Sequence, residues 1–227
     1  MFCIWCDTEI MIEVNWNNLF YPDHPKPLCD QCETKLDFLS GNQCTLCGRN
    51  WDFGNRCRDC ARWEKDPEWQ GVLTFNRSVF SYSKAIQEMV AKWKYRGDYV
   101  LVESFRQGFQ AAFTKQFSFL EVAVIVPIPL SLERLSERGF NQAEALADFL
   151  NATTIQALTR IHGEKQSKKT RRERLVSTNP FEVVTHIKTP VILIDDIYTT
   201  GITIRHAAKK LRDAGCPEVY SFTLIRG

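Results

Sequence analysis

The sequence has 227 residues, 44% of them hydrophobic, and a formal net charge of +2. This content can form a sizeable core in one large or two small domains, and the near-neutral charge excludes a uniformly basic nucleic-acid-binding chain. No apolar run approaches the roughly 18 to 20 residues of a membrane span, and the first residues lack the pattern of a signal peptide. We therefore expect a cytoplasmic protein that does not insert into a membrane.

The N-terminal part of the sequence is rich in cysteine. Eight of the nine cysteines form CxxC pairs, which are Cys3/Cys6, Cys29/Cys32, Cys44/Cys47 and Cys57/Cys60. A CxxC turn lets two thiolates bind one tetrahedral ion, so these pairs predict two structural Zn²⁺ ions. We expect a double zinc-ribbon domain over residues 1–65, in which the metals supply much of the folding free energy because the core is thin.

The spacing of the pairs leaves two ways to share the ions. Nine residues separate the third and fourth pairs, as in a compact ribbon, which favours sequential pairing along the chain. The 22 residues between the first and second pairs exceed the usual ribbon spacing, so a crossed arrangement of the first pair with the third stays open. The ninth cysteine, Cys216, follows a predicted helix and is expected to be a small buried hydrophobic residue.

Residues 66–227 alternate between strand and helix patterns and predict an α/β fold with a parallel sheet. A pair of strands is expected over residues 72–82. The apolar spacing from Ile86 to Trp93 predicts an amphipathic helix that ends near Gly97, followed by a second helix over residues 100–115. The later expected elements are a strand at 122–126, a helix from Asn141 with Glu144 as its capping partner, and strands at 155–159, 181–184 and 219–225.

A basic cluster lies at the end of the first predicted helix. Lys92, Lys94 and Arg96 alternate there with Trp93 and Tyr95. Such a pattern can follow a single-stranded nucleic acid while the rings stack on bases. Trp93 also continues the apolar stripe of its helix, which favours a place in the core instead.

A second basic segment, residues 165–174, has six Lys or Arg side chains, Lys168 and Lys169 among them. One interpretation is a loop that is mobile when empty and closes on an anion. The alternative is an ordinary solvated segment.

Residues 191–203 combine a strand, two acids and a hydroxyl-rich turn. Val191 to Ile194 is a short apolar run typical of a buried parallel strand, and Asp195 and Asp196 come directly after it. The carboxyl ends of such strands are where open α/β sheets bind ligands. A helix is expected to follow, with Ile204, Ala207, Ala208 and Leu211 on its inner face and Gly215 as its C-terminal cap.

The turn between this strand and helix predicts a phosphate site. Thr199, Thr200 and Thr203 supply hydroxyl donors, the helix start supplies backbone N–H groups, and Gly201 lets the backbone approach closely or take a positive φ. The two acids can accept the 2′ and 3′ hydroxyls of a ribose. The alternative is a solvated strand end beside an ordinary helix cap.

The segment resembles the phosphoribosyl pyrophosphate (PRPP) loop of type I phosphoribosyltransferases. In addition, residues 126–130 (Val-Pro-Ile-Pro-Leu) and 138–143 (Arg-Gly-Phe-Asn-Gln-Ala) are similar to the Val-Pro-x-Pro-Leu and Arg-Gly-Phe-Asn-Gln-Ala motifs of the competence protein F (ComF) family. With the cysteine pairs, these motifs span nearly the full length. The resemblance implies a phosphoribosyltransferase-like parallel sheet, flanked by helices, over residues 66–227.

The resemblance also assigns site residues. The PRPP-binding residues that it implies are Asp195, Asp196, Ile197, Tyr198, Thr199, Thr200, Gly201 and Thr203, with Mg²⁺ bridging ribose and pyrophosphate. The candidates for pyrophosphate are Pro127, Ile128 and Pro129 through backbone donors, Arg138 as a cation, and Lys168 and Lys169 in the flexible loop. The alternative is that Arg138 is an ordinary solvated arginine on the loop that enters a helix. Lys168 and Lys169 stand where the family loop commonly has Gly-Leu.

The resemblance implies three alternative functions. One is a cytoplasmic competence protein that supports uptake of transforming single-stranded DNA with a helicase-like partner protein. Another is a phosphoribosyltransferase that moves ribose 5-phosphate from PRPP, or a related phosphorylated ribose, to an amine or base. The third is a regulator that binds PRPP or a nucleotide without turnover. The sequence identifies neither an acceptor nor a base-binding site.

Overall fold

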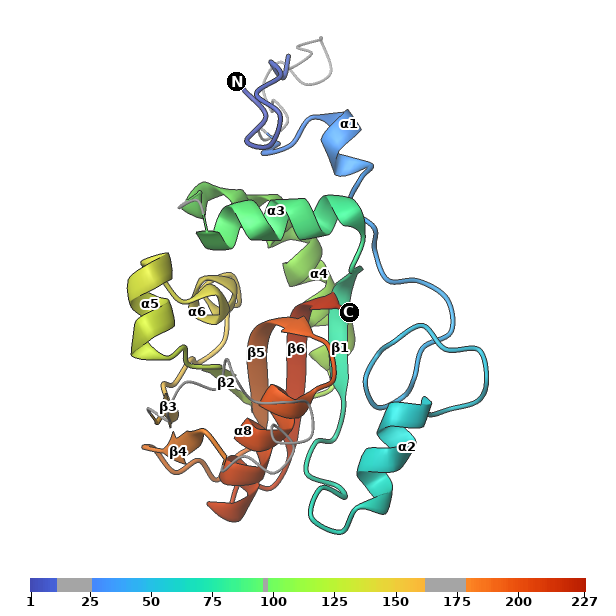
Figure 1. The fold of residues 1–227 in the computed structure, drawn as a ribbon, viewed down its shortest axis with the longest axis vertical. Coiled ribbons are helices and arrows are strands. Elements are labelled where there is room, and N and C mark those ends of the chain that lie inside the picture. Colours follow the sequence, from blue (N-terminus) through green and yellow to red (C-terminus); the bar gives the residue numbers. More distant parts are fainter. Residues whose placement is uncertain (12–25, 96–97, 162–178) are drawn as a thin grey trace.

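A four-stranded parallel sheet forms the centre of the molecule (Figure 1). The computed structural model describes residues 1–11, 26–95, 98–161 and 179–227. The strands lie in the order β1-β6-β5-β2, with bounds β1 Asn76–Ser81, β6 Val219–Arg226, β5 Val191–Tyr198 and β2 Val124–Pro127. The predicted α/β class with a parallel sheet is confirmed.

Helices cover both faces of the sheet, as α/β crossover connections require. Figure 1 shows α4 (Arg106–Phe117) behind the sheet and α8 (Ile202–Asp213) in front of it. Other helices between β1 and β5 are α3 (Lys84–Tyr95), the 3₁₀ helix η1 (Tyr99–Phe105), α5 (Leu132–Arg138) and α6 (Gln142–Ala147). An antiparallel pair, β3 (Leu158–Arg160) with β4 (Phe181–Val183), lies beside the main sheet.

Aromatic rings fill the space between α4 and the sheet. Phe109, Phe113 and Phe117 of α4 all contact the ring of Phe222 on β6, and the Phe109 and Phe222 centroids are 4.5 Å apart. Phe109 and Phe222 are fully buried. Such pairs stabilise the core beyond the area they bury, so this cluster fixes α4 on the sheet.

The cysteine-rich part contacts the sheet directly. In Figure 1 residues 1–11 and α1 (Asp30–Glu33) lie beyond α3, while α2 (Arg58–Lys65) lies near α8 and β1. Between them, residues 37–39 run antiparallel beside β1, with Leu39 N–H donating to Val79 O at 2.9 Å and Ser81 N–H to Asp37 O at 2.8 Å. At the opposite edge, Ile125 of β2 bonds to the backbone of Thr153 and Ile155.

Three expected elements differ from the structure. The strand pair at 72–82 is wrong, because one strand, β1, forms there and the preceding residues bond to β6 instead, through Thr74 and Phe75. The helix expected at 100–115 begins as η1 and becomes α-helical only from Arg106. β5 continues past Ile194 to Tyr198, because β6 pairs with it to that point.

The other elements are confirmed with small shifts in their ends. Asn141 caps α6 by accepting a hydrogen bond from Ala143 N–H at 3.0 Å, and its amide group contacts Glu144. The predicted inner face of α8 is fully buried, and Gly215 closes that helix with φ 94°.

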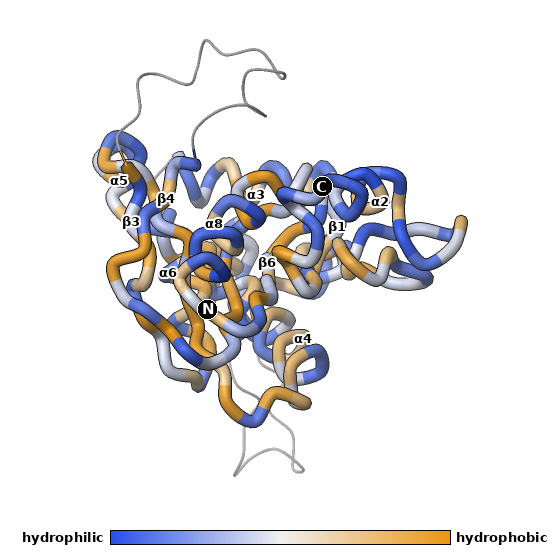
Figure 2. The backbone as a smooth tube through the Cα atoms, turned by 90° about the horizontal axis from the view of Figure 1, so that it is seen from below, coloured by the Kyte–Doolittle hydropathy of each residue, from blue (hydrophilic) through white to orange (hydrophobic). Residues whose placement is uncertain are grey.

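Hydrophilic and hydrophobic residues alternate along the helices (Figure 2). No helix within the described ranges is long and apolar enough to cross a membrane.

Candidate functional site

The carboxyl end of β5 leads into the predicted phosphate turn. Thr199 and Thr200 are exposed there, and Gly201, with φ 77°, is the N-cap of α8. A helix start carries N–H groups without intrahelical partners and the positive end of the helix dipole. The turn therefore presents hydroxyl and amide donors together at the edge where a ligand of an open α/β sheet binds.

Tyr198 explains why residue 201 is glycine. A Cβ atom at Gly201 would collide with the Tyr198 hydroxyl and ring, in addition to the strain of a positive φ. Tyr198 is 1% exposed, and burial raises the pKa of its hydroxyl. Tyr198 therefore forms the inner wall of the turn, and the resemblance-based role in contacting PRPP stays a prediction.

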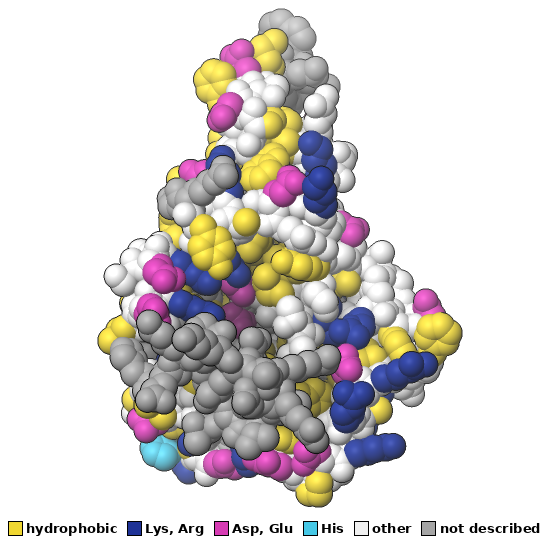
Figure 3. Space-filling model, in the orientation of Figure 1, with side chains coloured by type: hydrophobic (Ala, Val, Ile, Leu, Met, Phe, Trp, Pro, Cys, Tyr) yellow, Lys and Arg dark blue, Asp and Glu magenta, His cyan; other side chains and the backbone are white. Residues whose placement is uncertain are grey.

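Asp195 and Asp196 lie within β5, side by side along the strand. Successive residues of a strand face opposite sides of a sheet, and the two carboxylates accordingly have different neighbours. Asp196 forms an ion pair with Lys94 from the end of α3, while Asp195 accepts a hydrogen bond from the Asp196 N–H at 2.9 Å. Figure 3 shows acidic and basic side chains meeting in a hollow in the middle of the visible face.

The surroundings of Asp195 change its acidity. Burial, and then the negative charge of Asp196, raise the pKa of Asp195 from 3.8 to about 7. Lys94 and Arg160 oppose this shift with smaller effects. Because this pKa lies near neutral pH, Asp195 can gain or release a proton there, whereas an ordinary aspartate stays ionised.

The loop after β2 lies next to the acids. Pro127 pairs with Ile194 of β5, Ile128 N–H donates to Ile194 O at 2.9 Å, and Asn141 donates to Ile128 O at 3.1 Å. Proline has no N–H, so residues 127–129 have no free backbone donor in this arrangement. A pyrophosphate role for Pro127, Ile128 and Pro129 stays a prediction, and its donors would have to come from the residues that follow.

Arg138 connects α5 to α3. Its guanidinium donates to Gln142 Oε1 at 2.6 Å and lies over the ring of Tyr95, 5.3 Å from the centroid. This cation thus lies beside the end of α3 that also carries Lys94. Lys168 and Lys169 fall outside the described residues.

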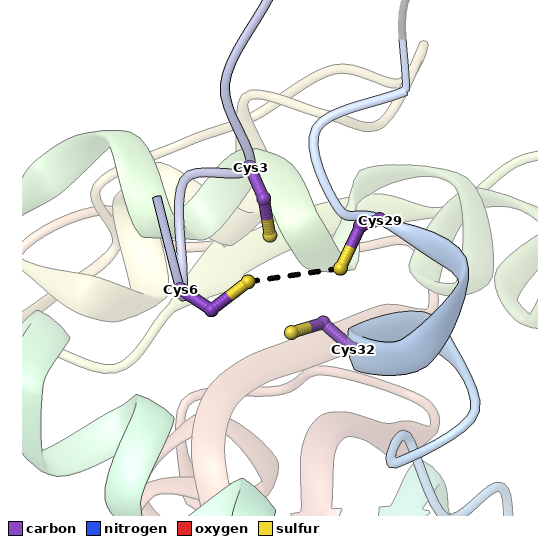
Figure 4. Close-up of side chains that lie close together, drawn as sticks. All are labelled: Cys3, Cys6, Cys29 and Cys32. Carbon is purple, nitrogen blue, oxygen red and sulfur yellow. Dashed lines mark hydrogen bonds between the residues drawn. The ribbon is translucent and has the colours of Figure 1, made fainter. Parts of the chain in front are cut away.

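The eight paired cysteines form two separate clusters. Cys3, Cys6, Cys29 and Cys32 make one (Figure 4), and Cys44, Cys47, Cys57 and Cys60 make the other. Within each, all sulfur atoms lie within 4.8 Å of one another. The sequential pairing is therefore correct and the crossed arrangement is wrong.

The sulfur positions fit a tetrahedral ion. Cys6 Sγ and Cys29 Sγ are 3.7 Å apart, as are Cys47 Sγ and Cys57 Sγ. Thiolates about 2.3 Å from a tetrahedral ion would be about 3.8 Å apart, far more than the length of a disulfide bond. Each cluster could therefore hold one metal ion.

Comparisons with known proteins agree on one family, although no family model matches the chain. It is 39% identical over 229 aligned residues to competence protein ComFC of Bacillus subtilis, covering 100% of this chain and 95% of the relative. This chain belongs to the competence protein ComFC family. ComFC of Streptococcus pneumoniae is 30% identical over the full length of both chains, and competence protein F of Haemophilus influenzae is 27% identical over 88% of this chain and 90% of its own.

Among solved structures, a hypoxanthine phosphoribosyltransferase from Staphylococcus aureus aligns with a TM-score of 0.27 and 13% identity, over 62% of this ComFC-family chain and 64% of that protein. The α/β class is established instead by the parallel strands and their crossover helices.

Two functional candidates of this ComFC-family chain were not found from sequence. Lys94 was grouped with Lys92 and Arg96 as a nucleic-acid contact, but it is 9% exposed and paired with Asp196. The available signal is that Lys94 lies four residues after Val90, on the helix face that periodicity assigns to the interior. Trp93 is fully buried, which confirms its place in the core, and Arg96 falls outside the described residues.

The second candidate that was not found from sequence is Arg226, at the end of β6. It is 5% exposed and donates to the backbone of both Cys47 and Tyr198. No motif in the sequence marks this residue.

Proposed function

We propose that this chain is a cytoplasmic competence protein that binds PRPP, or a related phosphorylated ribose, at the carboxyl edge of its sheet and supports uptake of transforming single-stranded DNA. The observation that carries the proposal is the junction of β5 and α8, where exposed Thr199 and Thr200 lie next to a glycine N-cap and follow two acids. Family membership supports the competence role.

The phosphate end of the ligand would bind at the start of α8. Backbone N–H groups and threonine hydroxyls can satisfy the oxygens of a phosphate monoester without a lysine. Gly201 has no Cβ that would collide with Tyr198, so the turn can take its positive φ beside that ring. Thr203, in the first turn of the helix, is half-buried and supplies a further hydroxyl.

The ribose would lie over the end of β5. Asp195 and Asp196 supply carboxylate oxygens on both sides of the strand end, which suit ribose hydroxyls and Mg²⁺, a cation that prefers oxygen ligands. Lys94 and Arg138 supply positive charge toward the pyrophosphate. When bound, Mg²⁺ would neutralise the charge of the pyrophosphate.

Both cysteine clusters would hold Zn²⁺ in this proposal. Tetrahedral sites with four cysteine ligands are typical of structural zinc. Elemental analysis of the purified protein should then give about two zinc ions per chain.

Calorimetry tests the PRPP site. Replacing both acids, Asp195→Ala with Asp196→Ala, should abolish binding of PRPP with Mg²⁺ while the zinc content stays unchanged. The control is Glu121→Ala with Asp213→Ala, which removes two exposed acids that precede β2 and β6, at the amino ends of the strands. Equal affinities for the acid-site variant and the control would contradict the proposed site.

The competence role requires partners, and the family resemblance implies two of them: single-stranded DNA and a helicase-like protein. Single-stranded DNA held through phosphate contacts should bind less tightly as salt rises, with a linear dependence of log affinity on log salt. A helicase-like protein is the proposed protein partner, and co-purification from competent cells would test it. Affinity for DNA that does not change with salt would argue against phosphate contacts.

A phosphoribosyltransferase activity is the second candidate, and one observation favours it. Burial and the charge of Asp196 raise the pKa of Asp195 to about 7, which suits a group that takes a proton from an acceptor at neutral pH. A screen of PRPP with candidate amines and bases, read by pyrophosphate release, distinguishes the two. PRPP binding without turnover across the screen would favour the third candidate, a non-catalytic regulator.

A further inference from the structure

Arg226, the last residue of β6, contacts the second cysteine cluster and the phosphate turn at the same time. Its Nε donates to Cys47 O at 3.0 Å and its Nη2 to Cys47 Sγ at 3.2 Å. Its Nη1 donates to Tyr198 O at 2.8 Å and to Thr199 O at 3.0 Å. One guanidinium therefore bridges two parts of the chain that are far apart in sequence.

Burial and stacking on Tyr198 hold the Arg226 guanidinium in place. Arg226 is 5% exposed and its guanidinium lies over the ring of Tyr198, 4.9 Å from the centroid. A buried cation is stable only when its donors are satisfied, and the planar fork of arginine fixes their directions. Movement of the Tyr198 and Thr199 carbonyls would leave donors of a buried charge without partners.

Helix α2 holds the next carbonyl of the turn. Trp63 Nε1 donates to Thr200 O at 3.3 Å, and the Trp63 ring lies over the buried guanidinium of Arg205 from α8. The N-cap of α2 is Cys57, a member of the second cluster. The carbonyls of Tyr198, Thr199 and Thr200 are thus all held from the side of that cluster.

Fixing these carbonyls also fixes the amides that follow them. In a planar trans peptide, the C=O of one residue and the N–H of the next point in opposite directions. The N–H groups of Thr199, Thr200 and Gly201 therefore point away from the cysteine cluster.

We infer that Arg226 is a positioning residue, anchored on the second cysteine cluster, that orients the amides of residues 199–201 toward a phosphate group. This inference rests on the proposed function for the identity of the ligand, but the rigidity of the turn can be measured without any ligand. The cluster then has a second role besides stabilising its own domain, since it is the fixed support of the phosphate turn.

Arg226→Gln tests the inference, with Arg106→Gln as the control. Arg106 is a partly exposed arginine that pairs with Glu103 and lies over Phe149, away from the turn. Two readouts are needed in the zinc-loaded protein: ¹⁵N relaxation of residues 199–201 without ligand, and calorimetric affinity for PRPP. Zinc content is measured in parallel.

For Arg226→Gln we expect unchanged zinc content, backbone order parameters that fall from about 0.85 to below about 0.6 at residues 199–201, and PRPP affinity weaker by about tenfold. Arg106→Gln should leave all three unchanged. Rigid amides and unchanged affinity in folded, zinc-loaded Arg226→Gln would overturn the inference.

A second variant covers the case in which Arg226→Gln does not fold. Arg226→Lys keeps a buried cation, but its single ammonium group cannot reach Cys47 O, Tyr198 O and Thr199 O together. It should raise the mobility of residues 199–201 while the zinc content stays the same, and an unchanged order parameter would overturn the inference. If the wild-type protein does not bind PRPP, the proposed ligand is wrong and the relaxation data alone decide on the turn.

Discussion

The pair formed by Lys94 and Asp196 shows how one buried side chain changes the interpretation of a motif. The sequence pattern grouped Lys94 with Lys92 and Arg96 as a nucleic-acid contact, but the Lys94 side chain is only 10% exposed and that of Asp196 15%. Burying one charge without its partner would be costly. The pair therefore places the Lys94 cation next to the expected position of pyrophosphate.

Lys94→Met should lower the free energy of unfolding by about 1 to 3 kcal/mol, because Asp196 loses its partner in a largely buried place. Urea denaturation measures this change. Lys92→Met, two residues earlier on the same helix, removes a more exposed pair with Asp98 and should cost less than about 1 kcal/mol. Adding Asp196→Asn to Lys94→Met should recover part of the loss, and strict additivity of the two changes would argue against the pair.

Asp195 gives the stability a distinct dependence on pH. Its pKa rises from 3.8 to about 7 on folding, so between these values the folded state holds a proton that the unfolded state releases. The contribution of this group to the free energy of unfolding therefore falls as pH rises from about 4 to 7 and levels off above.

In Asp195→Asn this dependence is removed. The variant should gain at least about 1 kcal/mol relative to the wild type between pH 5 and pH 8, the equivalent of one pKa unit or more. Asp213→Asn, at the exposed end of α8, corrects for the loss of one negative charge. A difference from the wild type that is the same at both pH values would show that the Asp195 carboxyl is not perturbed.

Among the elements, β5 and α8 were predictable from sequence because every local signal agrees. The β-branched run, the turn glycine, the apolar spacing of Ile204 to Leu211 and the Gly215 cap all indicate the same strand, turn and helix. The extension of β5 to Tyr198 was not predictable, since pairing with the end of β6 decides it. The missing second strand at residues 72–82 has the same cause, because its partner lies far away in sequence.

Gly201→Ala should separate backbone strain from steric collision in the turn. Gly139 has the same φ of 77° but open space around its Cβ position, whereas a Cβ at Gly201 would meet Tyr198. Gly139→Ala should cost about 1 to 2 kcal/mol in thermal or urea unfolding, and Gly201→Ala about 1 to 3 kcal/mol more. Equal losses in the two variants would mean that Tyr198 moves aside freely.

For the whole molecule, sequence predicted two four-cysteine clusters but not how differently they are built into the fold. The spacing of CxxC pairs is local information, while their pairing and docking depend on the tertiary structure. The second cluster is bonded to the sheet through Leu46 O and Asn76 N–H, at 2.7 Å, and through Arg226. The first lies beyond α3, where Lys92 is near the ring of Trp5.

Single cysteine changes should reveal this difference. Cys6→Ser and Cys60→Ser should each reduce the zinc content from about two ions to about one. Cys60→Ser should also lower the melting temperature by about 10 °C and weaken PRPP binding, because the sheet and the phosphate turn lose their support. Cys6→Ser should leave PRPP affinity within about twofold of the wild type. Identical losses of affinity in both variants would contradict a special role of the second cluster.

The short segments beside β1 and β2 have a consequence for the protein in a crowded cell. Unpaired strand edges invite another chain to add a strand, which leads to aggregation. Here residues 37–39 occupy one outer edge of the sheet and residues 153–155 occupy the other. A newly made copy whose cysteine-rich part has not yet docked would leave the β1 side open, so we expect docking of this part to reduce self-association of the protein.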